Sequence, residues 1–322
     1  MDPNHHTFAT PASPSERGPR PLPPGVEYHR VLAGDRRRIG RGILTIVLLV
    51  VGMFAFNIGL SLATALIDRQ MGHTPPTLGG TDHTLLFHFS NLFSIALLIP
   101  WSMCLQRWLY GVRGPSLHSV VSRVRFDLIG RSLLFIGPVW LAVSLIVLSF
   151  RPVEQAAQSS AYLLALLAIT LLVTPLQGAG EEYGYRGLVL RIASSWNRGP
   201  RTALVVGVLL SSLVFSLVHL SLDPWFNLWT FSLAVSMAVI TWRTGGLEIA
   251  CVVHALNNTL TYLLLIVLHA DQSAAVERSA GSGSAIMVLP CAVVIAIAVV
   301  VWLRTRGTGP ALTPHHPQSQ VR

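Results

Sequence analysis

The chain has 322 residues, of which 52% are hydrophobic and only 11% are charged, and its formal net charge is +9. Soluble globular domains carry about 25% charged residues, so this composition excludes a soluble or disordered chain and indicates a multi-pass membrane protein. All 23 basic residues are Arg. They are scattered between apolar stretches rather than gathered on one domain, which argues against nucleic acid as a partner.

The two ends of the chain have the composition of tails. Residues 1–40 are rich in Pro and Arg and lack an apolar period, and we expect them to form a disordered tail. The first apolar run starts only near Ile43 and is too long for a cleavable signal peptide, so we expect it to insert as a signal anchor. Residues 305–322 are expected to form a second disordered tail, which leaves 41–304 as the transmembrane domain.

Eight long apolar segments lie between the tails. About 20 apolar residues span a bilayer as a helix, and backbone groups in lipid must be satisfied within their own segment. The predicted fold is therefore all-α, a polytopic membrane protein with about eight transmembrane helices. The segments run over 42–67, 85–106, 128–149, 161–180, 202–222, 226–243, 247–268 and 284–303.

The Arg residues predict the orientation in the membrane. Arg-rich connections alternate with Arg-poor ones along the whole chain. If both termini are cytoplasmic, all the Arg-rich connections fall on the cytoplasmic side, where membrane proteins carry their excess of basic residues. We therefore expect a multi-pass protein of the cell membrane, of bacterial origin, with both ends inside.

Ionisable residues inside the spans are few. Because a charge is costly in lipid, such residues usually mark a functional site. Glu182 and Arg186 are four residues apart and can form an ion pair on one helix face, which leaves Glu181 to point elsewhere. His254 and Asn258 also share a face, and we expect Asn257 to point away from it.

Phe215 and His219 add a third such pair, on the fifth apolar segment. Three helices would thus bring a carboxylate, an imidazole and an imidazole–carboxamide pair to one cavity. Such groups suit hydrolysis, by activation of water and donation to an oxyanion. Glu181, His219 and His254 could equally hold a divalent metal such as Zn²⁺.

The depth of these groups poses a geometric problem. At about 1.5 Å per residue, Glu181 falls near the cytoplasmic end of the fourth span, whereas His219 falls near the outer end of the fifth. The two side chains can meet only if the fourth helix continues past Arg186 toward Ala193. The sequence therefore predicts a long fourth helix that places Glu181 deeper in the membrane.

The three motifs together resemble the CPBP family, the CAAX protease and bacteriocin-processing family that is also called the Abi family. They are Glu-Glu-x-x-x-Arg at Glu181–Arg186, Phe-x-x-x-His at Phe215–His219, and His-x-x-x-Asn at His254–Asn258. The resemblance covers roughly residues 160–268 and implies a four-helix catalytic core. It implies an intramembrane endopeptidase, and eukaryotic members of the family remove the last three residues of prenylated CAAX proteins.

The resemblance also implies roles for the individual residues. Glu181 would activate water together with His219, while His254 and Asn258 would stabilise the oxyanion. Glu182, Arg186 and Phe215 would support the site. Family members are often called metalloproteases, which keeps a divalent metal at Glu181, His219 and His254 as an alternative, although the chain has no His-Glu-x-x-His motif.

Other classes of function remain open at this point. A non-catalytic immunity or scaffold protein of the same family would bind a peptide or partner through the same cavity. A proton-coupled transporter would also explain buried Glu and His, but it predicts repeated halves with paired broken helices, which the sequence lacks. For the protease, the expected partners are membrane lipid and a peptide or membrane-protein substrate.

Overall fold

The computed structural model describes residues 20–34, 37–150, 154–272 and 279–315. In these ranges, eight helical stretches are long and apolar enough to cross a membrane, and no strand is present apart from isolated bridges. This confirms the predicted all-α fold with eight spans. The stretches are Ile39–Gln70, Leu85–Tyr110, Phe126–Ser149, Ser160–Ser194, Pro200–Leu217, Pro224–Thr244, Glu248–Val267 and Ala285–Thr305.

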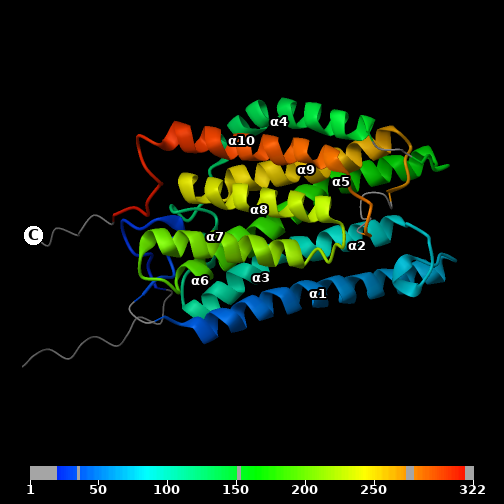
Figure 1. Ribbon diagram of the computed structural model, residues 1–322. Helices are drawn as coiled ribbons and strands as arrows, with labels where there is room; N and C mark the ends of the chain where they lie inside the picture. Colours follow the sequence, from blue (N-terminus) through cyan, green and yellow to red (C-terminus); the bar gives the residue numbers. More distant parts are fainter. Residues whose placement is uncertain (1–19, 35–36, 151–153, 273–278, 316–322) are drawn as a thin grey trace, which may run out of the picture.

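The spans correspond to helices labelled in Figure 1. Five spans are single helices: α1 (Ile39–Gln70), α4 (Phe126–Ser149), α7 (Pro200–Leu217), α8 (Pro224–Thr244) and α9 (Glu248–Val267). The other three are composite. The second span comprises α2 (Leu85–Ala96), α3 (Leu98–Leu105) and a π-helical turn, Gln106–Tyr110; the last comprises a short 3-10 turn and α10 (Val288–Thr305). The fourth comprises α5 (Ser160–Glu181), the π-helical segment η5 (Glu182–Val189) and α6 (Leu190–Ser194).

Side-chain caps explain where several helices begin. Ser159 accepts a hydrogen bond from the backbone of Tyr162 at the start of α5. Asp223 does the same for Phe226 at the start of α8, with Pro224 in the first turn. Such caps satisfy amide groups that the helix itself leaves without partners. The connection between α7 and α8 is short, residues 218–223, and His219 lies at its start, directly after α7.

The fourth span is much longer than its apolar segment. It runs without a break from Ser160 to Ser194, as the position of Glu181 required. At 1.5 Å per residue its 35 residues extend about 52 Å, whereas the hydrocarbon core of a bilayer is about 30 Å thick. Glu181 therefore lies well inside the helix rather than at its end.

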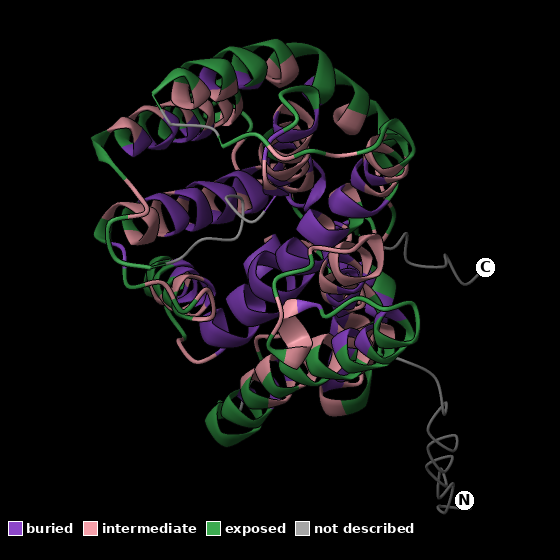
Figure 2. Ribbon diagram, turned by 90° about the vertical axis from the view of Figure 1, so that its right-hand side faces the viewer, coloured by how far each residue is buried: buried purple, intermediate pink, exposed green. Residues whose placement is uncertain are grey.

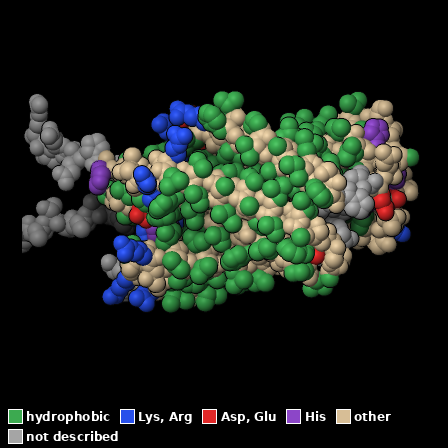
Figure 3. All heavy atoms as spheres, turned by 45° about the horizontal axis from the view of Figure 1, so that its top comes forward, with side chains coloured by type: hydrophobic (Ala, Val, Ile, Leu, Met, Phe, Trp, Pro, Cys, Tyr) green, Lys and Arg blue, Asp and Glu red, His purple; other side chains and the backbone are tan. Residues whose placement is uncertain are grey.

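The long fourth span forms the centre of the bundle. Every residue from Gly180 to Ser195 is buried, and Figure 2 shows buried residues running through the middle of the molecule. Helices α2 and α9 pack on α5, and close approach requires glycine: a Cβ on Gly180 would lie 2.2 Å from the carbonyl oxygen of Ile95. The outer helices α1, α4 and α10 expose large apolar side chains, and Figure 3 shows the hydrophobic surface on the face that carries α4 and α10.

The described parts of the two tails are packed against the bundle, which differs from the expectation of disorder for 1–40 and 305–322. Tyr28 is fully buried and donates its hydroxyl to the carbonyl of Leu117 at 2.6 Å. Arg30 donates to the carbonyl of Asn197 at 2.7 Å, and the backbone of Thr313 donates to Val26. These hydrogen bonds and the burial of Tyr28 explain the order. The rest of each tail, 1–19 and 316–322, lies outside the described residues.

We predict that His29, in the packed N-terminal segment, makes stability depend on pH. The side chain is fully buried beside Glu27, and burial lowers the pKa of the imidazole to about 4. The unfolded chain takes up this proton first as the pH falls, because its pKa is about 6.5. The contribution of a neutral His29 is thus complete above about pH 6.5 and is lost progressively toward pH 4. The melting temperature of the wild type should fall more between pH 7 and pH 5 than that of His29→Leu; equal falls would contradict this assignment.

Candidate active site

Two adjacent carboxylates occupy the junction of α5 and η5. Glu182 is fully buried and forms an ion pair with Arg186 one turn later, with 2.5 Å between Oε2 and the guanidinium Nε. The Arg186 guanidinium also lies over the ring of Phe215, 4.2 Å from its centroid. The ion pair expected from the four-residue spacing is therefore present, and Glu181 is left to face a different group.

His254, on α9, lies between the two carboxylates. Its Nε2 is 2.9 Å from Oε2 of Glu181, and its Nδ1 is 2.6 Å from Oε1 of Glu182. An ionised carboxylate only accepts hydrogen bonds, so two such partners require an imidazolium that donates from both nitrogens. With Arg186, the four groups then carry two negative and two positive charges, a neutral set that a membrane interior tolerates better than an unpaired charge.

His219 lies directly after the end of α7. Its Nδ1 is 2.7 Å from the carbonyl oxygen of Phe215, and its ring packs against the Phe215 ring at 4.6 Å between centroids. Because a carbonyl oxygen can only accept, Nδ1 is the donor, and a neutral ring has its lone pair on Nε2. Phe215 thus contacts both His219 and Arg186 and joins two parts of the site.

Asn258 belongs to a chain of three amides. Its Nδ2 donates to Oε1 of Gln177 at 2.8 Å, and its Oδ1 accepts from Nδ2 of Asn257 at 2.8 Å. One N–H of Asn258 is left over after these two contacts. The expectation that Asn257 points away is wrong, because His254 and Asn257 are three residues apart and so lie within about 60° on the helix.

The sequence hypothesis missed Gln177 altogether. Gln177 precedes Glu181 by four residues, so both side chains lie on one face of α5. A polar residue one helical turn before the first Glu of the motif was the signal that would have pointed to it.

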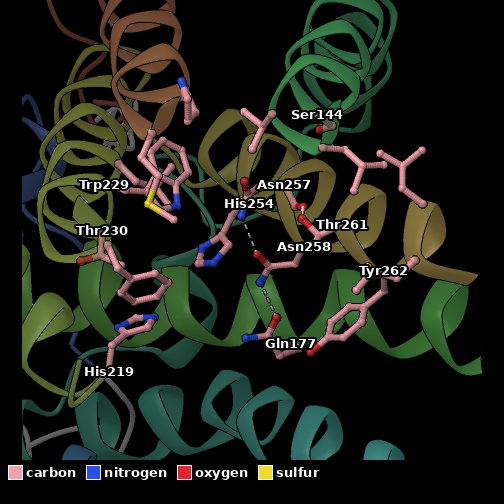
Figure 4. Close-up of a pocket in the computed structure, with 18 of the residues that line it drawn as sticks. Ser144, Gln177, His219, Trp229, Thr230, His254, Asn257, Asn258, Thr261 and Tyr262 are labelled. Atoms are coloured by element: carbon pink, nitrogen blue, oxygen red, sulfur yellow. Dashed lines mark hydrogen bonds between the residues drawn. The ribbon is translucent and has the colours of Figure 1, made fainter. Parts of the chain in front are cut away.

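A cavity of about 570 Å³ brings these groups together. Glu181, His219, His254, Asn257 and Asn258 all line it, whereas Glu182 and Arg186 do not. Figure 4 shows His254, Asn258 and Gln177 along one wall, with His219, Trp229 and Thr230 on the other side. Much of the remaining wall is apolar and includes Trp140, Val143, Val147, Leu264, Leu265 and Met287.

The donor set does not fit a three-ligand metal site. Among the described residues, no three His, Cys, Asp or Glu side chains are grouped so that they could hold a metal ion. In the candidate set of Glu181, His219 and His254, both ring nitrogens of His254 are already directed at carboxylates. A metal at this place would have to displace one of those contacts.

A match to a protein-family model shows which known proteins this part of the chain resembles. The model, described as type II CAAX prenyl endopeptidase Rce1-like, matches residues 161–260. This segment is therefore similar to the CPBP family. No curated protein and no solved structure matches the chain.

The CPBP match spans all three motifs, from the α5 helix to the Asn258 amide. Together with the eight apolar helices, it supports a multi-pass membrane protease of the CAAX type as the kind of function. It does not favour the alternative of a non-catalytic immunity or scaffold protein.

Proposed function

We propose that the protein is an intramembrane endopeptidase in which Glu181 activates water. The observation that carries the proposal is the position of Glu181, which lies on the cavity wall with a carboxylate oxygen held by His254 and with His219 lining the same cavity. A carboxylate in this setting can act as a general base on a water molecule beside a bound peptide. The experiment that tests the proposal compares new peptide ends in membranes that contain wild-type or Glu181→Gln protein.

The proposed hydrolysis proceeds through a tetrahedral intermediate. Glu181 takes one proton from water as the water oxygen bonds to the carbonyl carbon of the peptide, and the carbonyl electron pair moves to its oxygen. The remaining Asn258 N–H donates to that oxyanion, while Nε2 of His219 accepts from the water. When the intermediate collapses, the C–N bond breaks and Glu181 returns its proton to the leaving nitrogen.

The geometry favours a different role for His254 from the one suggested by the motif. An oxyanion donor needs an N–H directed into the cavity, but both nitrogens of His254 face carboxylates. We assign it to hold Glu181 in position, while Glu182 and Arg186 in turn hold His254. Asn258 then remains as the oxyanion donor, and Phe215 supports His219.

We predict that proteolysis needs no bound metal. Purified wild-type protein should contain no stoichiometric metal, chelators should leave its activity unchanged, and His219→Ala should lose activity with no change in metal content. Elemental analysis of both purified proteins provides the measurement. One metal ion per active chain, lost in His219→Ala, would contradict the proposal, because loss of a ligand weakens metal binding.

We predict that Gln177 acts by orienting the Asn258 amide. Gln177→Leu removes the acceptor for Asn258 Nδ2 at nearly constant size, so the amide can rotate away from the oxyanion. We expect kcat to fall by about tenfold, which corresponds to about 1.4 kcal/mol of transition-state stabilisation, with KM within about twofold. Asn258→Ala should cost about 10²–10³.

Asn91→Leu is the matched control for Gln177→Leu. Asn91 also lines the cavity, but its amide donates to the carbonyl of Phe87 and accepts from Nδ2 of Asn57 rather than bonding to Asn258. Its kcat should stay near that of the wild type. Equal losses in both variants would show that Gln177 contributes only to packing of the cavity wall.

Location at the cell membrane with both termini in the cytoplasm is part of the same proposal. Support comes from the distribution of charge, because Arg side chains gather at the end of the bundle where both described termini lie (Figures 1 and 3). Cytoplasmic ends of membrane proteins carry this excess of basic residues. The substrate is proposed to be a peptide or a membrane protein.

A further inference from the structure

The cavity reaches only one end of the bundle. Its lining includes Leu148 at the end of α4, Glu154 in the following connection, Asp271 after α9 and Ser282 before α10. All of these positions lie at the end where α4 and α9 finish and α8 and α10 begin. None of the described lining residues belongs to the connections at the opposite end, namely 111–125, 195–199 and 245–247.

The opposite end is closed by a packed apolar cluster. Tyr28 from the N-terminal segment packs with Leu117, Val120, Tyr183 and Leu247, and each of these side chains is buried. The guanidinium of Arg191, also buried, stacks 3.9 Å from the centre of the Tyr28 ring. Since Tyr183 follows Glu182 directly, this cluster separates the site from the end where the termini lie.

The closed end is also the Arg-rich end. Among the described residues, the cavity end carries only Arg69, at the end of α1, whereas Arg20, Arg30, Arg37, Arg38, Arg41 and most of the other described Arg residues belong to the closed end. Basic residues flank the cytoplasmic ends of membrane helices, so the open end of the cavity faces the outside of the cell.

We propose that the site takes its substrate from the extracytoplasmic face. Its substrates are then exported or membrane-anchored polypeptides that present a segment outside the membrane, rather than the cytosolic ends of soluble proteins. The substrate class rests on the proposed protease function, whereas the side of access does not. The apolar wall formed by Trp140, Val143 and Val147 would contact apolar side chains of such a segment.

Accessibility of single cysteines to a charged methanethiosulfonate reagent tests the side of access. Cys104, Cys251 and Cys291 are first replaced by Ala, because they are free cysteines. Thr261→Cys then places a thiol in the cavity, and Thr202→Cys places one at the closed end; both threonines are exposed. In intact cells we expect at least about tenfold faster labelling of Thr261→Cys than of Thr202→Cys, and equal labelling after the membrane is permeabilised.

The reverse order in intact cells, or labelling of Thr261→Cys only after permeabilisation, would overturn the proposal. Ser282→Cys, at the mouth of the cavity, repeats the test in case Thr261→Cys does not fold.

A second measurement concerns the substrates themselves. Peptide ends that depend on Glu181 should map to the outer side of membrane and exported proteins, and ends that map to cytosolic segments would contradict the substrate class.

The two measurements separate the side of access from the proteolytic function. Outward labelling without any Glu181-dependent cleavage would leave the access route standing and would contradict the protease. Labelling of Thr261→Cys only after permeabilisation, together with Glu181-dependent cleavage, would contradict the access route and leave the protease standing.

Discussion

Glu181→Gln should abolish proteolysis and leave the fold intact. The substitution removes the base but keeps the shape, and the Gln carbonyl oxygen can still accept from Nε2 of His254. Glu181 borders the cavity, and the ion pair between Glu182 and Arg186 is untouched. Loss of a general base lowers the rate by about 10²–10⁴-fold.

Two measurements on purified protein check this prediction. The rate of peptide cleavage should drop to the limit of detection, and the melting temperature should stay within a few degrees of the wild type. Cleavage at more than about one tenth of the wild-type rate would remove Glu181 from the chemistry. A large fall in melting temperature would mean that its role is structural.

Glu182→Gln should damage stability as well as activity. Arg186 is fully buried, and its carboxylate partner is Glu182. Without it, the guanidinium retains the Phe215 ring, which carries no compensating negative charge, while Nδ1 of His254 at 3.5 Å belongs to a ring that is itself cationic. Loss of one member of a buried pair costs about 3–5 kcal/mol. Thermal or denaturant unfolding of the two single variants measures the difference.

A double variant provides the control for this argument. Arg186→Met combined with Glu182→Leu removes both charges and keeps the volume, and replacing a buried ion pair by apolar residues is often neutral. We therefore expect the double variant to be more stable than Glu182→Gln while remaining inactive, because His254 has lost a carboxylate partner. If Glu181→Gln and Glu182→Gln lower stability equally, the proposed division of roles is incorrect.

The sequence predicted the fold well because lipid imposes simple rules on helices. Apolar runs such as 42–67 and 128–149 correspond closely to the helices Ile39–Gln70 and Phe126–Ser149. Hydropathy alone would have ended the fourth span near Gly180, yet the helix continues to Ser194. Polar and charged side chains from Glu181 onward are satisfied by partners in the protein, which a hydropathy scale does not register.

The two tails show where sequence composition fails to predict structure. Pro-rich and Arg-rich composition predicts disorder, but Tyr28, Arg30 and Thr313 form specific contacts with residues far away in the sequence. Such contacts depend on the arrangement of helix ends in space. No local pattern in the chain encodes them.

The candidate site was predictable where helical spacing decides contacts. The Glu182–Arg186 pair follows directly from a four-residue separation. The bridge that His254 forms between Glu181 and Glu182 joins α9 to the start of a π-helical segment, and the sequence gives no sign of that change in helical winding. Isolated π-helical turns are frequent at functional sites, and here the turn begins at the second carboxylate.

Isotope labelling tests the central claim, that water activated by Glu181 hydrolyses peptide bonds in this cavity. Membranes that contain wild-type or Glu181→Gln protein are incubated in H₂¹⁸O, and the new peptide ends are identified by mass spectrometry. We predict a set of new C-termini that carry ¹⁸O in the wild type and are absent from Glu181→Gln. The same ends in both samples, or no ends specific to the wild type, would contradict the account.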